Sequence, residues 1–155
     1  MISERGEIQI TLAGTRGCRF QVSISRLQRN VKAILKALGW KPDASLSLLL
    51  TGDRQVRKLN KKHLGHDWPT DVISFSQLEG KPLGVKKTAS CLGDIVISLE
   101  TTVRQAAEYG NSFDYELHFY ICHGILHLMG WDDKSKKEAK KMENKQKAIL
   151  KKVLS

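Results

Sequence analysis

The segment from Ser112 to about Met129 places the strongest constraint on how this chain can fold. It reads as one long, largely apolar helix that begins after Ser112, a favoured N-cap residue, and ends before Gly130. A largely apolar helix is stable only when other elements cover it. We therefore expect this helix at the centre of the domain, with the remaining elements packed around it.

Shorter segments with strand-like and helix-like patterns surround this helix in the sequence. Apolar and polar residues alternate along 8–12 and 20–24, whereas the apolar residues of 26–38 follow helical spacing, with Ser25 as the expected N-cap. The polar segment 77–90 is predicted to be a loop. Further strands are predicted at 46–51, 71–76 and 92–98, and further helices from Asp53 to about His63, at 99–109 and at 134–154. The sequence thus predicts an α+β fold, a small mixed sheet with packed helices.

Composition bounds the class of protein. A chain of 155 residues with 41% hydrophobic residues is expected to form a single domain, residues 1–155. The net charge of +10 is concentrated in residues 1–62 and 134–155, which favours a polyanionic partner such as nucleic acid. The three cysteines, Cys18, Cys91 and Cys122, show no paired spacing, and no signal peptide or membrane span is evident. We expect a cytoplasmic protein.

The end of the long helix carries a candidate metal site. His123 and His127 are four residues apart, so both imidazoles can point at one ion. Gly130 can take the left-handed conformation that ends a helix, and Asp132 or Asp133 could then return as a third ligand. Spacing alone allows two packed histidines as readily, but the returning carboxylate favours a metal ion with one open coordination position.

The same segment resembles a known family. His123-Gly-Ile-Leu-His127-Leu-Met-Gly-Trp-Asp-Asp133 is similar to the HGxLHLxGYDH signature of the YbeY rRNA maturation factors, metal-dependent endoribonucleases implicated in processing the three-prime end of small-subunit ribosomal RNA and in ribosome quality control. Three further blocks, 59–60, 69–75 and 92–98, resemble family segments in the same order. The resemblance runs from about 46 to 150.

Two positions depart from the family pattern. Asp133 stands where the family has its third histidine ligand, so the resemblance implies a site of His123, His127 and Asp133 that holds one divalent ion, zinc by preference. Leu64 stands where the family has an arginine associated with RNA cleavage. His63 and His66 flank this position, but neither provides a permanent bidentate phosphate clamp.

Other residues are open to a functional or a structural reading. Asp71 and Asp94 could orient water or substrate, although a structural carboxylate is the commoner case. Trp68 and Trp131 could stack on bases, although packing is the commoner use of tryptophan. His118 is expected to face away from the metal, at the surface or the edge of the core. Cys91 and Cys122 are expected to be core thiols.

The resemblance implies a metal-dependent, single-strand-specific endoribonuclease acting in 16S ribosomal RNA maturation and ribosome quality control. Its expected partners are single-stranded or ribosomal RNA and the small ribosomal subunit. Two alternatives stay open: a metallohydrolase of another substrate class, and a ribosome-associated assembly factor whose metal is structural. The sequence identifies neither a general base nor individual substrate-binding residues.

Overall fold

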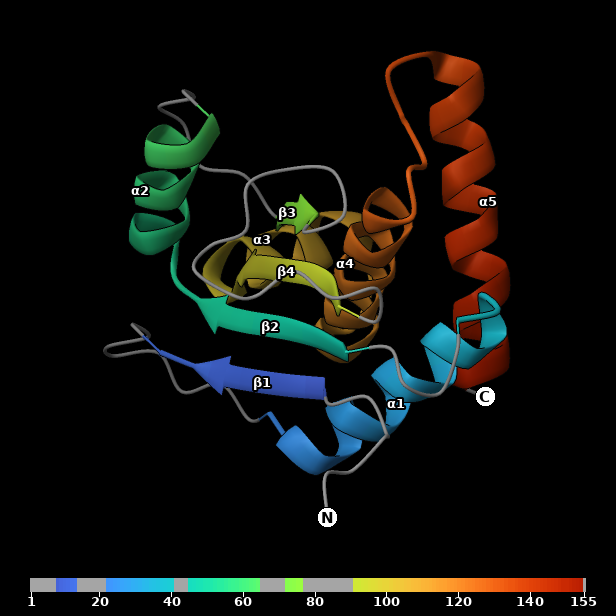
Figure 1. The fold of residues 1–155 in the computed structure, drawn as a ribbon, viewed down its shortest axis with the longest axis horizontal. Coiled ribbons are helices and arrows are strands. Elements are labelled where there is room, and N and C mark those ends of the chain that lie inside the picture. Colours follow the sequence, from blue (N-terminus) through green and yellow to red (C-terminus); the bar gives the residue numbers. More distant parts are fainter. Residues whose placement is uncertain (1–7, 14–21, 41–44, 65–71, 77–90, 155) are drawn as a thin grey trace.

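A mixed four-stranded sheet forms the centre of the fold (Figure 1). The computed structural model describes residues 8–13, 22–40, 45–64, 72–76 and 91–154, with backbone alone at 62–64, 72–76 and 91–92. The strand order is β1-β2-β4-β3, in which β3 is antiparallel to β4 and the other pairs are parallel. The elements of the described part are β1 (Ile8–Leu12), α1 (Ile24–Ala37), β2 (Ser45–Thr51), α2 (Asp53–Leu64), β3 (Val72–Ser76), β4 (Cys91–Ser98), α3 (Leu99–Tyr109), α4 (Phe113–Leu128) and α5 (Lys136–Val153).

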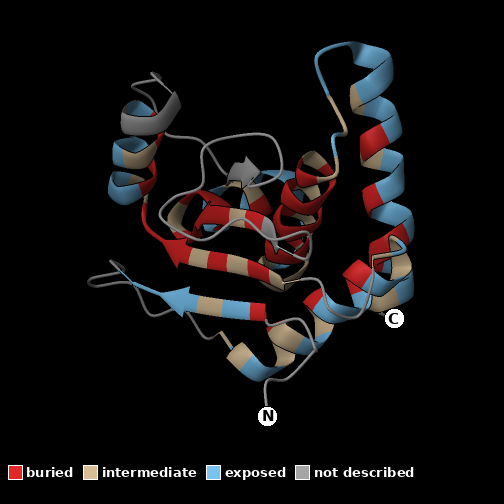
Figure 2. Cartoon of the chain, in the orientation of Figure 1, coloured by how far each residue is buried: buried red, intermediate tan, exposed pale blue. Residues whose placement is uncertain are grey.

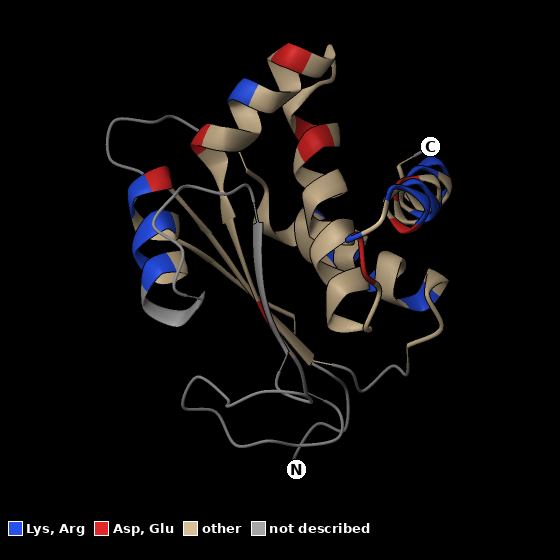
Figure 3. Ribbon diagram, turned by 90° about the horizontal axis from the view of Figure 1, so that it is seen from above, with Lys and Arg blue, Asp and Glu red and all other residues tan. Residues whose placement is uncertain are grey.

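The two faces of the sheet are covered unequally. Alternate residues of β2 and β4, such as Leu48 and its register partner Ile95, join α1, α4 and α5 in the main hydrophobic core. The intervening residues, such as Val96, pack on the opposite face against Val56 of α2. Seen from above, α2 lies on one side of the sheet, and α4 and α5 lie on the other (Figure 3). The large core therefore lies on the side of α4.

Helix α4 is the centre of that core, as the sequence predicted. It contacts α1, α3, α5, β3 and β4, and most of its residues are buried (Figure 2). Because neighbours surround it, the helix can be apolar on most sides. Ser112 caps it by accepting a hydrogen bond from the Tyr115 backbone N–H at 3.0 Å. The cap and these contacts hold α4 against the sheet and the other helices.

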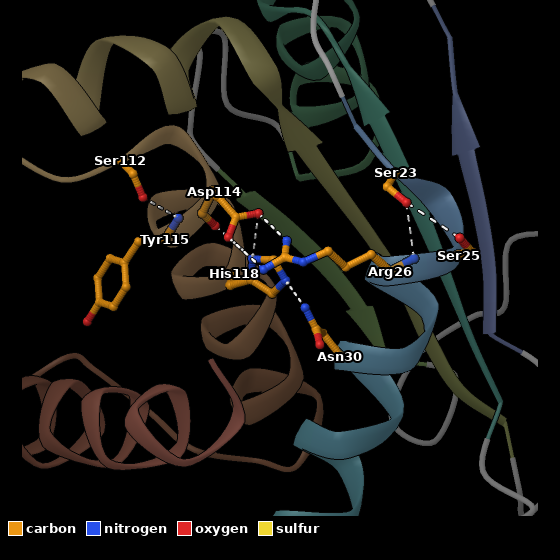
Figure 4. A network of polar contacts seen from close by, with 8 residues as sticks. All are labelled: Ser23, Ser25, Arg26, Asn30, Ser112, Asp114, Tyr115 and His118. Carbon is orange, nitrogen blue, oxygen red and sulfur yellow. Dashed lines mark hydrogen bonds and ion pairs between the residues drawn. The ribbon is translucent and has the colours of Figure 1, made fainter. Parts of the chain in front are cut away.

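A polar network fixes the N-terminal end of α4 to α1 (Figure 4). Arg26 donates two hydrogen bonds to the carboxylate of Asp114, one of them 3.0 Å long. These hydrogen bonds lower the pKa of Asp114 against the opposing effect of burial. Asn30, one turn further along α1, donates to the Nε2 atom of His118 at 2.9 Å. Arg26 therefore joins two helices.

The predicted elements agree with the structure except near residue 24. The prediction of a strand over 20–24 is wrong over 22–24, because residues 22 and 23 belong to no strand and Ile24 is the first residue of α1; residues 20 and 21 lie outside the described residues. The N-cap is Ser23 rather than Ser25, because the Ser23 hydroxyl accepts from the Arg26 N–H at 3.3 Å. The alternating pattern includes Val22 and Ile24, which lie on either side of Ser23. Because Ser23 caps the helix, α1 begins inside the segment that the alternation assigns to a strand.

The remaining sequence predictions have mixed outcomes. Segment 77–90, predicted as a loop, lies outside the described residues. Asp53 begins α2 as predicted, but its side chain accepts from Thr101 at 2.6 Å and from Ser98 and Arg104 of the α3 region, so it joins two helices. Among the described helices, none is long and apolar enough to cross a membrane.

Candidate metal centre

Two histidines of α4 converge at its C-terminal end. His123 and His127 lie one turn apart, with their ring centroids 4.5 Å apart and their planes nearly perpendicular. Their Nε2 atoms are 3.0 Å apart. Both side chains are partly buried, so the pair stands at the rim of the core, where a small ligand can reach it.

The end of α4 brings a carboxylate to the same point. Gly130 has φ +95°, and the Trp131 N–H bonds back to the Leu126 carbonyl at 3.0 Å, which is the hydrogen bond of a Schellman cap. The chain reverses there, and Asp133 places Oδ2 3.6 Å from His123 Nε2 and 3.5 Å from His127 Nε2. The left-handed glycine thus makes the third ligand available.

The Nδ1 atoms of His123 and His127 make hydrogen bonds that determine the tautomer of each ring. His127 Nδ1 donates to the Trp131 carbonyl at 3.0 Å. His123 Nδ1 donates to the Gln146 side-chain oxygen at 3.2 Å, and Gln146 is oriented because its amide nitrogen donates to the Phe119 carbonyl at 3.1 Å. With the protons on Nδ1, both Nε2 atoms present lone pairs.

This arrangement fits a divalent cation. Two imidazole lone pairs and a carboxylate oxygen face one another, and all three atoms lie within 4.8 Å of each other. Such acceptors repel one another unless a metal ion or a proton lies between them. Zinc–nitrogen bonds of 2.0 to 2.1 Å in a tetrahedron require ligand atoms about 3.3 Å apart, which is near the 3.0 to 3.6 Å found here. Three ligands leave a fourth position open.

The predicted site residues fall into three groups. The structure brings His123, His127 and Asp133 together, and among the described residues no other group of this kind forms. Trp131 packs against the core, which confirms the structural reading, and Asp94 lies within β4. The side chains of His63, Leu64 and Cys91 and all of His66, Trp68 and Asp71 lie outside the described residues.

His118 does not belong to the metal group. Its Nδ1 donates to the Asp114 carbonyl at 2.7 Å, and its Nε2 accepts from Asn30 (Figure 4). Burial lowers the pKa of His118, which favours the neutral ring. The prediction that it faces away from the metal is confirmed, but its placement at the surface or core edge is wrong, because its side chain is 0% exposed.

Two features of the site escaped the sequence analysis. Gln146 lies in the lysine-rich segment 134–154, yet it is only 1% exposed. It shares the buried stripe of α5 with Met142, Ile149 and Leu150, so a glutamine at helical spacing among apolar residues was the available signal. A cleft of about 550 Å³ between α3, α4 and α5, which has His123 and Asp133 in its wall, was also not foreseen.

Comparison with known proteins establishes the family. The model of the family described as "Endoribonuclease YbeY" matches residues 16–154. The chain belongs to the YbeY family. Proteins named Endoribonuclease YbeY from Symbiobacterium thermophilum and Pelotomaculum thermopropionicum are 48% identical over 118 residues and 41% identical over 124 residues. These alignments cover 75% and 80% of this chain and 76% and 82% of the relatives.

A solved structure extends this agreement to the YbeY-family fold. The solution structure of TM1509 from Thermotoga maritima matches with a TM-score of 0.62 and 29% sequence identity. The match covers 95% of this chain and 89% of that one. The α+β architecture is therefore confirmed, and the family names identify the chain as a member of a family of endoribonucleases, which are nuclease hydrolases.

Proposed function

We propose that this protein is a metal-dependent endoribonuclease that cuts single-stranded RNA during maturation of the three-prime end of 16S ribosomal RNA and in ribosome quality control, in the cytoplasm. One observation carries the metal dependence. The Nδ1 protons of His123 and His127 are held by protein acceptors, so both Nε2 lone pairs face the Asp133 carboxylate. This set of donors suits zinc with an open position.

The residues around the site have distinct tasks in this proposal. His123, His127 and Asp133 would hold the cation, which supplies a Lewis acid and lowers the pKa of bound water towards 7. The Trp131 carbonyl and Gln146 keep the imidazoles in the ligating tautomer. With one carboxylate and two neutral imidazoles, the site would keep a net charge near +1 with a divalent ion. That charge suits the phosphodiester anion.

Basic side chains on the molecular surface support a nucleic-acid substrate. Exposed cations follow one face of α2 at a spacing of three or four residues, and more lie along α5 (Figure 3). These positions on α2 are Arg54, Arg57, Lys58 and Lys61. Side chains of this kind neutralise backbone phosphates without reading sequence. The net charge of +10 suits an RNA-rich partner such as the small ribosomal subunit.

A matched pair of variants tests the metal-dependent reaction. Asp133→Asn removes the ligand charge, whereas Asp132→Asn changes the neighbouring carboxylate, which accepts from the Lys134 N–H at 3.1 Å outside the metal group. Cleavage of a labelled single-stranded RNA is measured with zinc-loaded and chelator-stripped protein. Asp133→Asn and stripping should each lower the rate at least tenfold, with Asp132→Asn near wild type. Equal rates for all samples would overturn the proposal.

Leu64 favours a second candidate, an assembly factor whose metal is structural. The family arginine expected at this position would meet the developing phosphate charge with two hydrogen bonds, which leucine cannot provide. If the protein is a nuclease limited at this position, Leu64→Arg should raise cleavage by up to about 100-fold. A folded Leu64→Arg variant without added cleavage, together with an inactive wild type that still binds small subunits, would support the assembly factor.

A further inference from the structure

The cleft beside the metal group contains a wall of aromatic rings. Tyr115 and Phe119 lie one turn apart on α4, with ring centroids 6.2 Å apart and planes within 25° of parallel. Tyr109, at the end of α3, lines the same cleft and is 65% exposed, one of few large apolar side chains so exposed among the described residues. Aromatic walls open to solvent are the usual platform for an unpaired base.

The carboxylates of the cleft suit a ligand with hydrogen-bond donors better than they suit a phosphate group. Glu116 is buried, with 3% of its surface exposed, and it accepts from the Asn111 amide at 2.9 Å. A carboxylate has about four lone-pair sites, so Glu116 keeps capacity for further donors. Glu143 lies opposite on α5, where Lys147 bonds to it at 2.9 Å. This acidic interior disfavours an anion and favours a neutral group with N–H donors.

The metal group and the cleft share one face of α4. Glu116, Tyr120 and His123 are at positions i, i+4 and i+7, and all three line the cleft. Seven residues of helix span about 10 Å, which is comparable to the length of one nucleotide. A phosphate at the His123 end therefore places its own base against the aromatic wall.

We propose that this cleft is a subsite for one unpaired nucleobase of the RNA strand, with guanine preferred over uracil. The proposal rests on the proposed function, because the metal group positions the phosphate. Guanine offers adjacent N1–H and N2–H donors to the Glu116 carboxylate. Uracil flanks its single N–H with two carbonyl oxygens, which the carboxylate repels. The rings of Tyr109, Tyr115 and Phe119 provide the stacking surface.

Binding of mononucleotides tests the subsite without requiring cleavage. Zinc-loaded wild-type protein is titrated calorimetrically with 5′-GMP, 5′-UMP and ribose 5-phosphate. GMP should bind at least threefold more tightly than UMP, and ribose 5-phosphate most weakly. Tyr109→Ala should weaken GMP binding about fivefold or more. Val103→Ala, on a different face of α3, is a matched control, because Val103 is also exposed but does not line the cleft.

Glu116→Gln tests the base preference and should bring GMP and UMP to within twofold of each other, with the melting temperature measured alongside. Phe119→Leu, which keeps the backbone acceptor of Gln146, repeats the stacking test at a second position. Equal affinity for GMP and ribose 5-phosphate, or unchanged GMP binding in both aromatic variants, would overturn the subsite. RNA cleavage by a wild type without base binding would leave the proposed function intact. Base binding without cleavage would contradict the proposed function alone.

Discussion

The two ends of helix α4 hold histidines in the same tautomer but with different partners at Nε2. At the N-terminal end, both nitrogens of His118 have protein partners, Asn30 and the Asp114 carbonyl. At the C-terminal end, protein acceptors occupy only the Nδ1 atoms of His123 and His127, and the Nε2 atoms face each other and Asp133. The partner of Nε2 therefore separates a structural histidine from a candidate metal ligand.

Substituting one histidine at each end of α4 gives the largest expected effects, on zinc affinity at one end and on stability at the other. His127→Ala should lower zinc affinity at least 100-fold, because a ligand is lost, and should barely change the stability of the metal-free protein. His118→Leu should leave zinc affinity within twofold and destabilise the fold by about 1–3 kcal/mol, because the Asn30 amide and the Asp114 carbonyl each lose a hydrogen-bond partner. Zinc competition and chemical denaturation measure the two quantities. Loss of zinc affinity in a folded His118→Leu variant would contradict the assignment of His118 to a structural role alone.

Variants of Gln146 test whether the proton on His123 Nδ1 controls zinc binding. Gln146→Leu removes the acceptor of the His123 Nδ1 proton and should lower zinc affinity about tenfold. Gln146→Glu restores an acceptor and should recover most of that loss. Chelator competition measures the affinities, and the metal-free melting temperature separates them from altered packing of α5. Equal zinc affinities for the two variants would show that the tautomer does not depend on Gln146.

The pH dependence of stability gives the smallest effect. The pKa of His118 is lowered from 6.5 by burial, so its contribution to stability is fully present above about pH 6.5 and is lost as the pH falls and the unfolded chain takes up the proton. Asp114 and Arg26 are the charged groups that face it. Between pH 7 and 5.5, wild type should lose more stability than His118→Leu, by at most about 1.4 kcal/mol per pH unit. Parallel stability curves would contradict this.

Local signals predicted much of the fold and the metal group. The serine cap, the apolar α4 and the glycine before Asp133 all act within a few residues, so the sequence displays them directly. The error at Ile24 arose because Val22 and Ile24 fit a strand period on either side of a capping serine. Sequence periodicity does not reveal which of two nearby serines caps a helix.

Partners from distant segments could not be predicted in the same way. Asn30 and His118 are 88 residues apart, and their contact depends on how α1 crosses α4. The roles of Gln146 and of the cleft depend likewise on how α5 packs beside α4. The buried thiol of Cys122, whose pKa burial raises to about 12, agrees with the predicted core position, because an apolar helix surrounded by neighbours buries most of its residues.

The position of Gln146 on the C-terminal helix has a consequence for the order of assembly. A growing polypeptide contains α4, and with it both histidines, before Asp133 and well before Gln146 have been added. Until α5 docks, the His123 ring lacks the acceptor that holds its proton on Nδ1. In the proposed function, the site would therefore be complete only after the last helix has docked.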